Sequence, residues 1–283
     1  MNYYIDSSLK ALVYILACFV LFMLGKHVFK LFNRKIDIKD ELVNKDNFAF
    51  SVAMVGYYLG LLLAIGGAFI GKSKGLATDL IELGVYGSLA IVLLNISGFL
   101  NKKFILYKFS VEKEIVSDRN TGTGVVIAAN HVANGLILLG AFSGEGGGLD
   151  TAMVFWLVGQ VTLVFVARFY NAILPYDVHE HIEKDNVAVG IGFAGAMVAI
   201  SNLIRNAVMH DFEGWSLAGI DLAVGVVVGI VLLPMVRLLT DMVLIPGRKL
   251  TYEIVNQEVP NCDAALFEAF AYIGGSVLIA WCI

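Results

Sequence analysis

The sequence predicts an all-α protein, a polytopic transmembrane helical bundle of about eight spans built by tandem duplication of a four-helix unit. The chain of 283 residues is 58% hydrophobic and 16% charged, with a mean hydropathy of +0.79, whereas soluble domains are about 45–50% apolar and about 25% charged. Apolar stretches of roughly 20 residues recur, each long enough to cross a hydrocarbon core of about 30 Å. They lack the alternation of an outer-membrane barrel, so helices are expected to span the bilayer.

Eight stretches are expected to be transmembrane helices. They cover residues 9–30, 48–71, 76–100, 122–142, 149–170, 187–209, 215–239 and 263–283. The fourth is interrupted by Asn130, His131 and Asn134, and the eighth carries Glu268. No Pro/Gly/Ser-rich linker separates them, so no soluble domain is expected.

The basic residues indicate the orientation in the membrane, because cytoplasmic loops carry an excess of Lys and Arg. Of the 20 basic residues, 16 lie in or beside the connections after spans one, three, five and seven. This pattern predicts a multi-pass protein of the bacterial inner membrane with these connections in the cytoplasm and both termini outside. Segments such as 102–116 mix aromatic, aliphatic and basic residues, which favours contact with anionic lipid at the headgroup interface.

Comparison of the chain with itself at an offset of 139 positions indicates the duplication. Asn47 aligns with Asn186, Gly56 with Gly195, and the segment 114–116 with 253–255. The match runs without a gap through two loops, and it predicts a first repeat at 1–145 and a second at 146–283. Each half has an even number of spans, so the halves should have the same orientation, related by a pseudo-twofold axis along the membrane normal.

A weaker repeat appears within each half. The second span opens with DNFAFSVAMVG and the fourth with RNTGTGVVIAA. Asn at a helix start caps free N–H groups, and small residues at a spacing of three to four allow close helix contact in lipid. We therefore expect Asn47, Asn120 and Asn186 to be helix-entry caps, a packing role that we favour over ligand binding.

These residues resemble a known family. The pattern D-N-x-A-x(6)-G at 46–56 and 185–195, with the loop IPGRKLTYEI at 245–254 and the final helix NCDAALFEAFAYIGG, is similar to the YjfL-like bacterial inner-membrane family, a domain of unknown function with about four spans per unit. The resemblance covers nearly the whole chain as two tandem units. It implies a bacterial inner-membrane location and brings no activity, catalytic residue or cofactor. The first unit departs from the loop pattern, and the fourth span carries Asn130 and His131 where an apolar stretch is more usual.

Ionisable residues inside a membrane cost free energy and are therefore candidates for function. Glu82 and Asp221 align at the 139 offset, each about two turns into its helix. They could form an acidic pair that binds a cation or carries a proton. The alternative is two carboxylates in a wet vestibule or in structural hydrogen bonds, and the sequence favours neither.

Arg205 lies near the same predicted depth as Asp221, with Asn202 three residues before it. A structural Arg205–Asp221 ion pair is one interpretation, and anion or substrate binding is the other. These residues form the outer polar layer of a hypothetical pathway.

The inner polar layer comprises Asn130, His131, Asn134 and Glu268. A membrane-embedded His131 suits a proton relay or gate because its pKa ordinarily lies near neutrality; a neutral His131 in a helix–helix hydrogen bond is the alternative. The pseudo-twofold would bring Glu268 to the depth of His131, close enough to pair.

No pattern predicts an enzyme, a metal site or a cofactor. The loop YDVHEHIEKD contains His179 and His181, which could bind a metal weakly but suit a solvated loop better. GEGGG at 144–148 follows no strand, so it is expected to be a flexible connection and not a phosphate loop.

Two functions remain open from the sequence. One is small-solute or ion translocation along the axis between the repeats. The other is a non-transporting scaffold for envelope maintenance that binds lipid or a peripheral partner through its cytoplasmic loops. The expected partner is the lipid bilayer, without nucleic acid; a homo-oligomer is compatible with the sequence.

Overall fold

The computed structural model describes residues 2–70, 73–144, 146–244 and 247–282, and over these ranges it is helical, without a strand. Its long helices are α1 (Asn2–Phe32), α2 (Phe48–Gly67), α3 (Leu76–Phe104), α5 (Thr121–Phe142), α6 (Leu149–Ile173), α8 (Val187–Val208), α9 (Trp215–Leu239) and α10 (Cys262–Cys282). Within the described ranges, eight helices are long and apolar enough to cross a membrane. The predicted all-helical membrane bundle is therefore confirmed.

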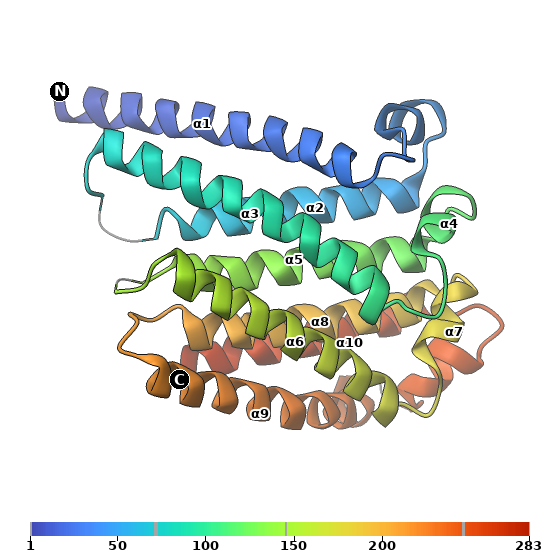
Figure 1. Ribbon diagram of the computed structural model, residues 1–283. Coiled ribbons are helices and arrows are strands. Elements are labelled where there is room, and N and C mark those ends of the chain that lie inside the picture. The colour runs from blue at the N-terminus through green and yellow to red at the C-terminus, as the bar shows by residue number, and fades with distance from the viewer. Residues whose placement is uncertain (1, 71–72, 145, 245–246, 283) are drawn as a thin grey trace.

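Short helices gather at one end of the bundle. They are η1 (Asp40–Asn44), α4 (Val111–Val116), α7 (Val178–Glu183), η2 (Thr240–Leu244) and η3 (Tyr252–Asn256), where η denotes a π-helix. We call this the basic end, because the Lys- and Arg-rich connections lie here. Helix α1 begins and α10 finishes at the opposite end (Figure 1).

The chain forms a hairpin four times over within the described ranges. Each hairpin has an outer helix (α1, α3, α6 or α9), one or more short helices at the basic end, and an inner helix (α2, α5, α8 or α10). The two-hairpin unit predicted from the 139 offset is thus itself a pair of similar hairpins. This agrees with the weaker repeat in the sequence.

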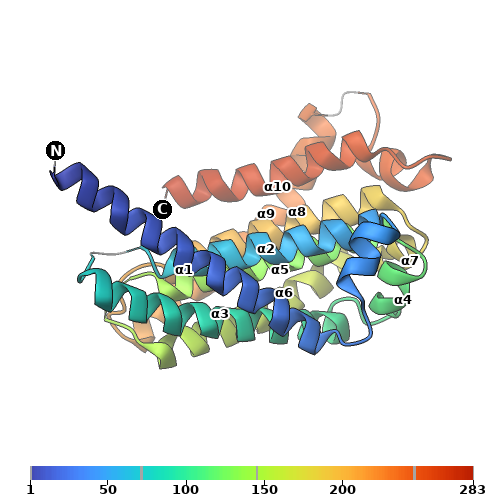
Figure 2. The same cartoon turned by 90° about the horizontal axis from the view of Figure 1, so that it is seen from above.

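The four inner helices form a row. Contacts join α2 to α5, α5 to α8 and α8 to α10, and Figure 1 shows them following one another across the molecule. In the view from above, α1 crosses the bundle obliquely (Figure 2). Each inner helix uses one face for its predecessor and the other for its successor, so the second half lies beside the first along the row. The pseudo-twofold axis expected between the halves stays a prediction.

Small residues hold the row together. A Cβ added at Gly60 of α2 would lie 2.2 Å from the carbonyl oxygen of His131 in α5, and one at Gly190 of α8 would lie 2.8 Å from the carbonyl oxygen of Gly122. Backbones therefore touch where lipid supplies no hydrophobic drive for association. The Gly190–Gly122 contact lies on the α5–α8 seam, where the sequence suggested a pathway between the repeats.

Outer surfaces of the bundle are apolar and contact the lipid bilayer. Along α1, for example, large side chains are more than half exposed: Leu12, Ile15, Leu16 and Phe19. Such exposure would be a liability in water but suits a hydrocarbon solvent.

Candidate functional site

Asparagine caps fix the basic end of the bundle. Asn47, Asn120 and Asn186 are the N-caps of α2, α5 and α8, as the sequence predicts. Each side-chain oxygen accepts a hydrogen bond from the N–H three residues on, at 3.1, 2.7 and 3.0 Å. Each Nδ2 donates to an isoleucine carbonyl in the short helix of the next hairpin; the acceptors are Ile115, Ile182 and Ile254. The caps therefore link successive hairpins, which is a structural role.

A polar chain runs from α3 through α5 to α6, and so from the first unit into the second. Asn101 of α3 donates to Asn130 of α5, Asn134 donates to the Asn130 side chain at 3.1 Å, and Gln160 of α6 donates to Asn134. Asn130 and Asn134 were expected as a polar layer, whereas Asn101 and Gln160 were not. Three buried atoms of the chain have no hydrogen-bond partner: Asn101 Oδ1, Asn130 Nδ2 and Gln160 Oε1.

His131 faces away from that chain, into a cavity of about 490 Å³ between α1, α2, α3, α4 and α5. Its ring meets Tyr57 edge to face at 5.3 Å between centroids. Tyr57 is held in turn by a hydrogen bond to the Gly25 carbonyl at 2.9 Å and one from Asn95 at 3.1 Å. The His131 side chain is buried, yet its Nδ1 has no partner. Among the buried polar atoms of the residues that line this cavity, it is the one without a partner.

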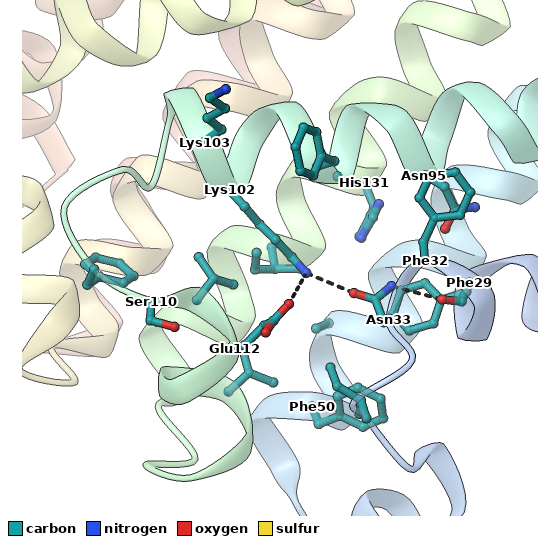
Figure 3. Close-up of a pocket in the computed structure, with 18 residues that line it drawn as sticks. Phe29, Phe32, Asn33, Phe50, Asn95, Lys102, Lys103, Ser110, Glu112 and His131 are labelled. Atoms are coloured by element: carbon teal, nitrogen blue, oxygen red, sulfur yellow. Dashed lines mark hydrogen bonds and ion pairs between the residues drawn. The ribbon is translucent and has the colours of Figure 1, made fainter.

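The cavity has an apolar part and a charged part. Phenyl rings from three helices form the apolar wall: Phe29, Phe32, Phe50 and Phe99. Toward the basic end, the Lys102 amino group donates to Asn33 Oδ1 at 2.9 Å and lies 4.0 Å from a Glu112 carboxylate oxygen (Figure 3). Lys103 also lines the cavity. The result is an amphipathic site, open at one side, whose charged part carries two cations and one carboxylate.

Glu268 has different partners from those predicted. It is fully buried and accepts a hydrogen bond from Arg237 Nη1 at 2.5 Å and from the Tyr272 hydroxyl at 3.2 Å. The expected pairing with His131 is wrong, because the row places these residues in different hairpins. Arg237 also donates to Thr251 Oγ1 at 3.0 Å.

The predicted outer layer does not converge. Glu82 forms an ion pair with Lys74 at 2.8 Å in a half-exposed position, and Asp221 is exposed on α9. Arg205 donates to Asn202 Oδ1 at 3.0 Å and contacts the Met209 sulfur, not Asp221. Asn202 itself donates to Ser276 Oγ at 3.2 Å. The expected acidic pair and the expected Arg205–Asp221 ion pair are therefore corrected, because Glu82 is paired with Lys74 and Arg205 is bonded to Asn202.

The His179/His181 loop is structural. It forms α7, where His179 is buried and hydrogen-bonds the Ile105 carbonyl through Nε2 at 2.6 Å, while His181 packs on Tyr176. Among the described residues, no group of three or more His, Cys, Asp or Glu side chains could hold a metal ion.

Sequence reasoning missed the charged partners in both units. Lys102 and Arg237 are among the 16 basic residues that the sequence analysis used only to predict the orientation, although both are mostly buried. One signal was available for Arg237: at the 139 offset it aligns with Gly98, so the second half bears a charge at this position where the first bears no side chain.

A family model described as "Domain of Unknown Function (DUF350)" matches residues 3–142 and again 146–283. A "UPF0719 transmembrane protein" of Aquifex aeolicus (strain VF5) is 27% identical over 219 residues, covering 73% of this chain and 78% of the relative. No solved structure matches the chain at a significant level. The expected membrane family with two tandem units is confirmed.

Proposed function

Since the chain belongs to the DUF350 family, a domain of unknown function, we propose a function from its own site. This multi-pass membrane protein binds an anionic amphiphile in the first unit. The cavity beside His131 carries the proposal. Its volume of about 490 Å³ lies in the range of small-molecule sites, about 300–1,000 Å³. It combines phenyl walls with the cations Lys102 and Lys103, and basic pockets between transmembrane helices bind lipid head groups.

The orientation of a bound amphiphile follows from the two parts of the cavity. An acyl chain would contact Phe29, Phe50 and Phe99, and the head group would lie between Lys102 and the buried Nδ1 of His131. The head-group chemistry is a carboxylate or a phosphate, since both accept hydrogen bonds from an ammonium group. Glu112, already 4.0 Å from Lys102, favours a head group with one negative charge over a head group with two.

A cavity-filling substitution tests the proposal. A Cβ added at Gly98 would lie 3.2 Å from the His131 ring, so Gly98→Leu fills the cavity; at Gly84, on the same helix, nothing lies within 4 Å of an added Cβ, so Gly84→Leu is the matched control. We expect native mass spectrometry of the detergent-solubilised protein to detect a 1:1 complex with lysophosphatidylglycerol that Gly98→Leu weakens at least about tenfold. Equal binding by both variants, or no complex with the unmodified protein, would overturn the proposal.

Head-group variants and ligands separate the sources of the anion. Lys102→Met should weaken binding of lysophosphatidylglycerol and of oleate but not of lysophosphatidylcholine, whose head group has no net charge. Lys113→Met is the control, because Lys113 is an exposed cation of the same end that does not line the cavity. Tighter binding of oleate would identify a carboxylate ligand, and tighter binding of the phospholipid a phosphate.

We also propose that the basic end faces the cytoplasm of a bacterial cell and both termini lie outside its inner membrane. The positive-inside rule supports this orientation. A cysteine introduced at Lys39 in a cysteine-free background should resist a membrane-impermeant thiol reagent in intact spheroplasts and react after lysis. Reaction before lysis would contradict the orientation.

Translocation of an ion or a small solute stays a prediction from the sequence. Flux through liposomes that is abolished by Glu82→Gln together with Asp221→Asn would favour it over amphiphile binding.

A further inference from the structure

The pocket of the first unit has a counterpart in the second, and the shared caps establish the correspondence. Asn120 and Asn261 play the same part before α5 and α10: the Asn120 amide N–H donates to the Glu114 carbonyl and the Asn261 amide N–H to the Glu253 carbonyl. The second connection is two residues longer, with a spacing of eight instead of six. Residues of α5 and α10 are therefore matched from these asparagines and not at the constant offset of 139.

Contacts within the row confirm that register. A Cβ at Gly56 would touch Ala128 at its Cα, and one at Gly195 would touch Ala269 at its Cα. On the outer helices, Gly75 and Gly214 both precede the helix with a positive φ, of 108° and 128°. Position by position, Ala53, Gly98, Glu112, Ile127 and His131, which line the first pocket, correspond to Gly192, Arg237, Thr251, Glu268 and Tyr272.

The second set forms one bonded cluster. Arg237 extends from the position of Gly98 to Glu268, at the position of Ile127, with an N···O distance of 2.5 Å. Thr251, at the position of Glu112, accepts the second guanidinium hydrogen bond, and Tyr272, at the position of His131, donates to Glu268. Gly192 makes room for the carboxylate, since a Cβ there would lie 2.5 Å from Glu268 Oε2.

We infer that Arg237 and Glu268 are an intramolecular plug that fills the second unit's copy of the binding pocket. In the first unit the pocket is open beside Gly98 and Ile127. In the second unit Arg237 and Glu268 occupy these two positions, and their side chains fill the corresponding space. The chain therefore takes one anionic amphiphile, in the first unit. This inference rests on the proposed function, and it adds a stoichiometry and the two residues that fill the second pocket; the second unit also has Asp241 at the position of Lys102.

Exchanging the plug between the units tests the inference. Arg237→Gly with Glu268→Ile removes both partners of the plug, so no buried charge is left unpaired. Asp241→Lys is added because Asp241 occupies the position of Lys102, and the opened variant then carries the first unit's residues at all three positions. Gly98→Arg with Ile127→Glu installs the plug in the first unit. By native mass spectrometry with lysophosphatidylglycerol, we expect one ligand on the unmodified protein, two on the opened variant and none on the plugged variant.

The outcomes separate the two claims. No ligand on the unmodified protein would overturn the proposed function. If the unmodified protein and the opened variant each bind one ligand, the plug alone is overturned. Two ligands on the unmodified protein would also overturn the plug, without the need for a variant. Binding at the retained first pocket reports that the opened variant has folded.

Discussion

Asn120 is a residue on which three elements depend. Its side chain caps α5, donates to the Ile182 carbonyl at 2.6 Å, and donates to Glu114 Oε2 at 2.9 Å. Burial raises the pKa of Glu114, and the hydrogen bond from Asn120 opposes that rise by favouring the carboxylate. A substitution at Asn120 should therefore destabilise the contact between the two units.

Asn120→Ala should lower the free energy of unfolding by about 2–4 kcal/mol, because it removes a cap and leaves buried Glu114 without this hydrogen bond. SDS-induced unfolding followed by circular dichroism measures the effect. Asn44→Ala is the control: Asn44 makes an exposed hydrogen bond to Asp40 at 3.1 Å, and its loss should cost less than about 0.5 kcal/mol. A loss at Asn120 no larger than at Asn44 would contradict the linking role of the cap.

His179 gives the stability a pH dependence. Burial lowers the pKa of His179 below its ordinary value of 6.5; the Ile105 carbonyl and Asp177 oppose this shift, and Lys108 and Arg168 add to it. The unfolded chain therefore binds a proton at higher pH than the folded chain does. The stabilisation is complete above pH 6.5 and is lost as the pH falls toward the lower folded pKa.

Melting temperatures in detergent should thus fall between pH 7.5 and 5.5. His179→Gln, which retains a donor for the Ile105 carbonyl, should flatten this part of the profile, while His210→Gln, at an exposed position, should leave it unchanged. An unaltered slope in His179→Gln would show that other groups cause the acid sensitivity.

The sequence revealed cap residues better than it revealed partners. An asparagine before a small-residue helix is a local signal, so Asn47, Asn120 and Asn186 could be assigned without a structure. The Arg237–Glu268 pair could not be assigned, because it depends on the register between α9 and α10, which the longer connection before α10 shifts by two residues.

At the scale of the element, close helix contact depends on individual glycines. Gly60→Ala would place its Cβ 2.2 Å from the His131 carbonyl oxygen, so α2 and α5 must separate. We expect a loss of about 1–3 kcal/mol or more by the same unfolding measurement, as for other overpacked positions. Gly84→Ala, with open space around it, should be neutral or stabilise by up to about 1 kcal/mol through helix propensity. Equal changes in the free energy of unfolding at both positions would contradict the claim that individual glycines permit the close contact between inner helices.

Spanning helices were predictable and the short ones were not. The expected spans at 187–209 and 215–239 match α8 and α9 almost to the residue, because length and hydropathy determine a transmembrane helix. Helices α4 and α7 have only six residues each. They are stabilised by caps and by packing on neighbouring hairpins, and no local pattern encodes that packing.

At the scale of the whole molecule, a row of similar hairpins raises the question of what ends it. In α2, α5 and α8, the face that contacts the next inner helix carries small residues, and Gly56, Ala129 and Gly195 occupy equivalent positions there. On α10 the equivalent residue is Phe270, and the outward face of this helix is more than half exposed at Phe267, Phe270, Leu278 and Trp281. At the other end of the row, α2 exposes Phe48, Val55 and Leu62. Bulky side chains thus close both ends, as atypical terminal units do in repeat proteins.

Replacing these residues by their small counterparts should extend the row between molecules. Val55→Ala and Leu62→Gly on α2, combined with Phe267→Ala and Phe270→Gly on α10, copy the residues that α5 and α2 use at their contact. In lipid, close backbone approach is the main drive for such association, so energy transfer between labelled copies in liposomes should rise well above that of the unmodified protein. Ile220→Ala, Val224→Gly, Val227→Ala and Val231→Gly on lipid-exposed α9 is the matched control, and it should not raise the transfer. Head-to-tail association of the unmodified protein through α2 and α10, at the level of the redesigned variant, would show that large side chains do not terminate the row.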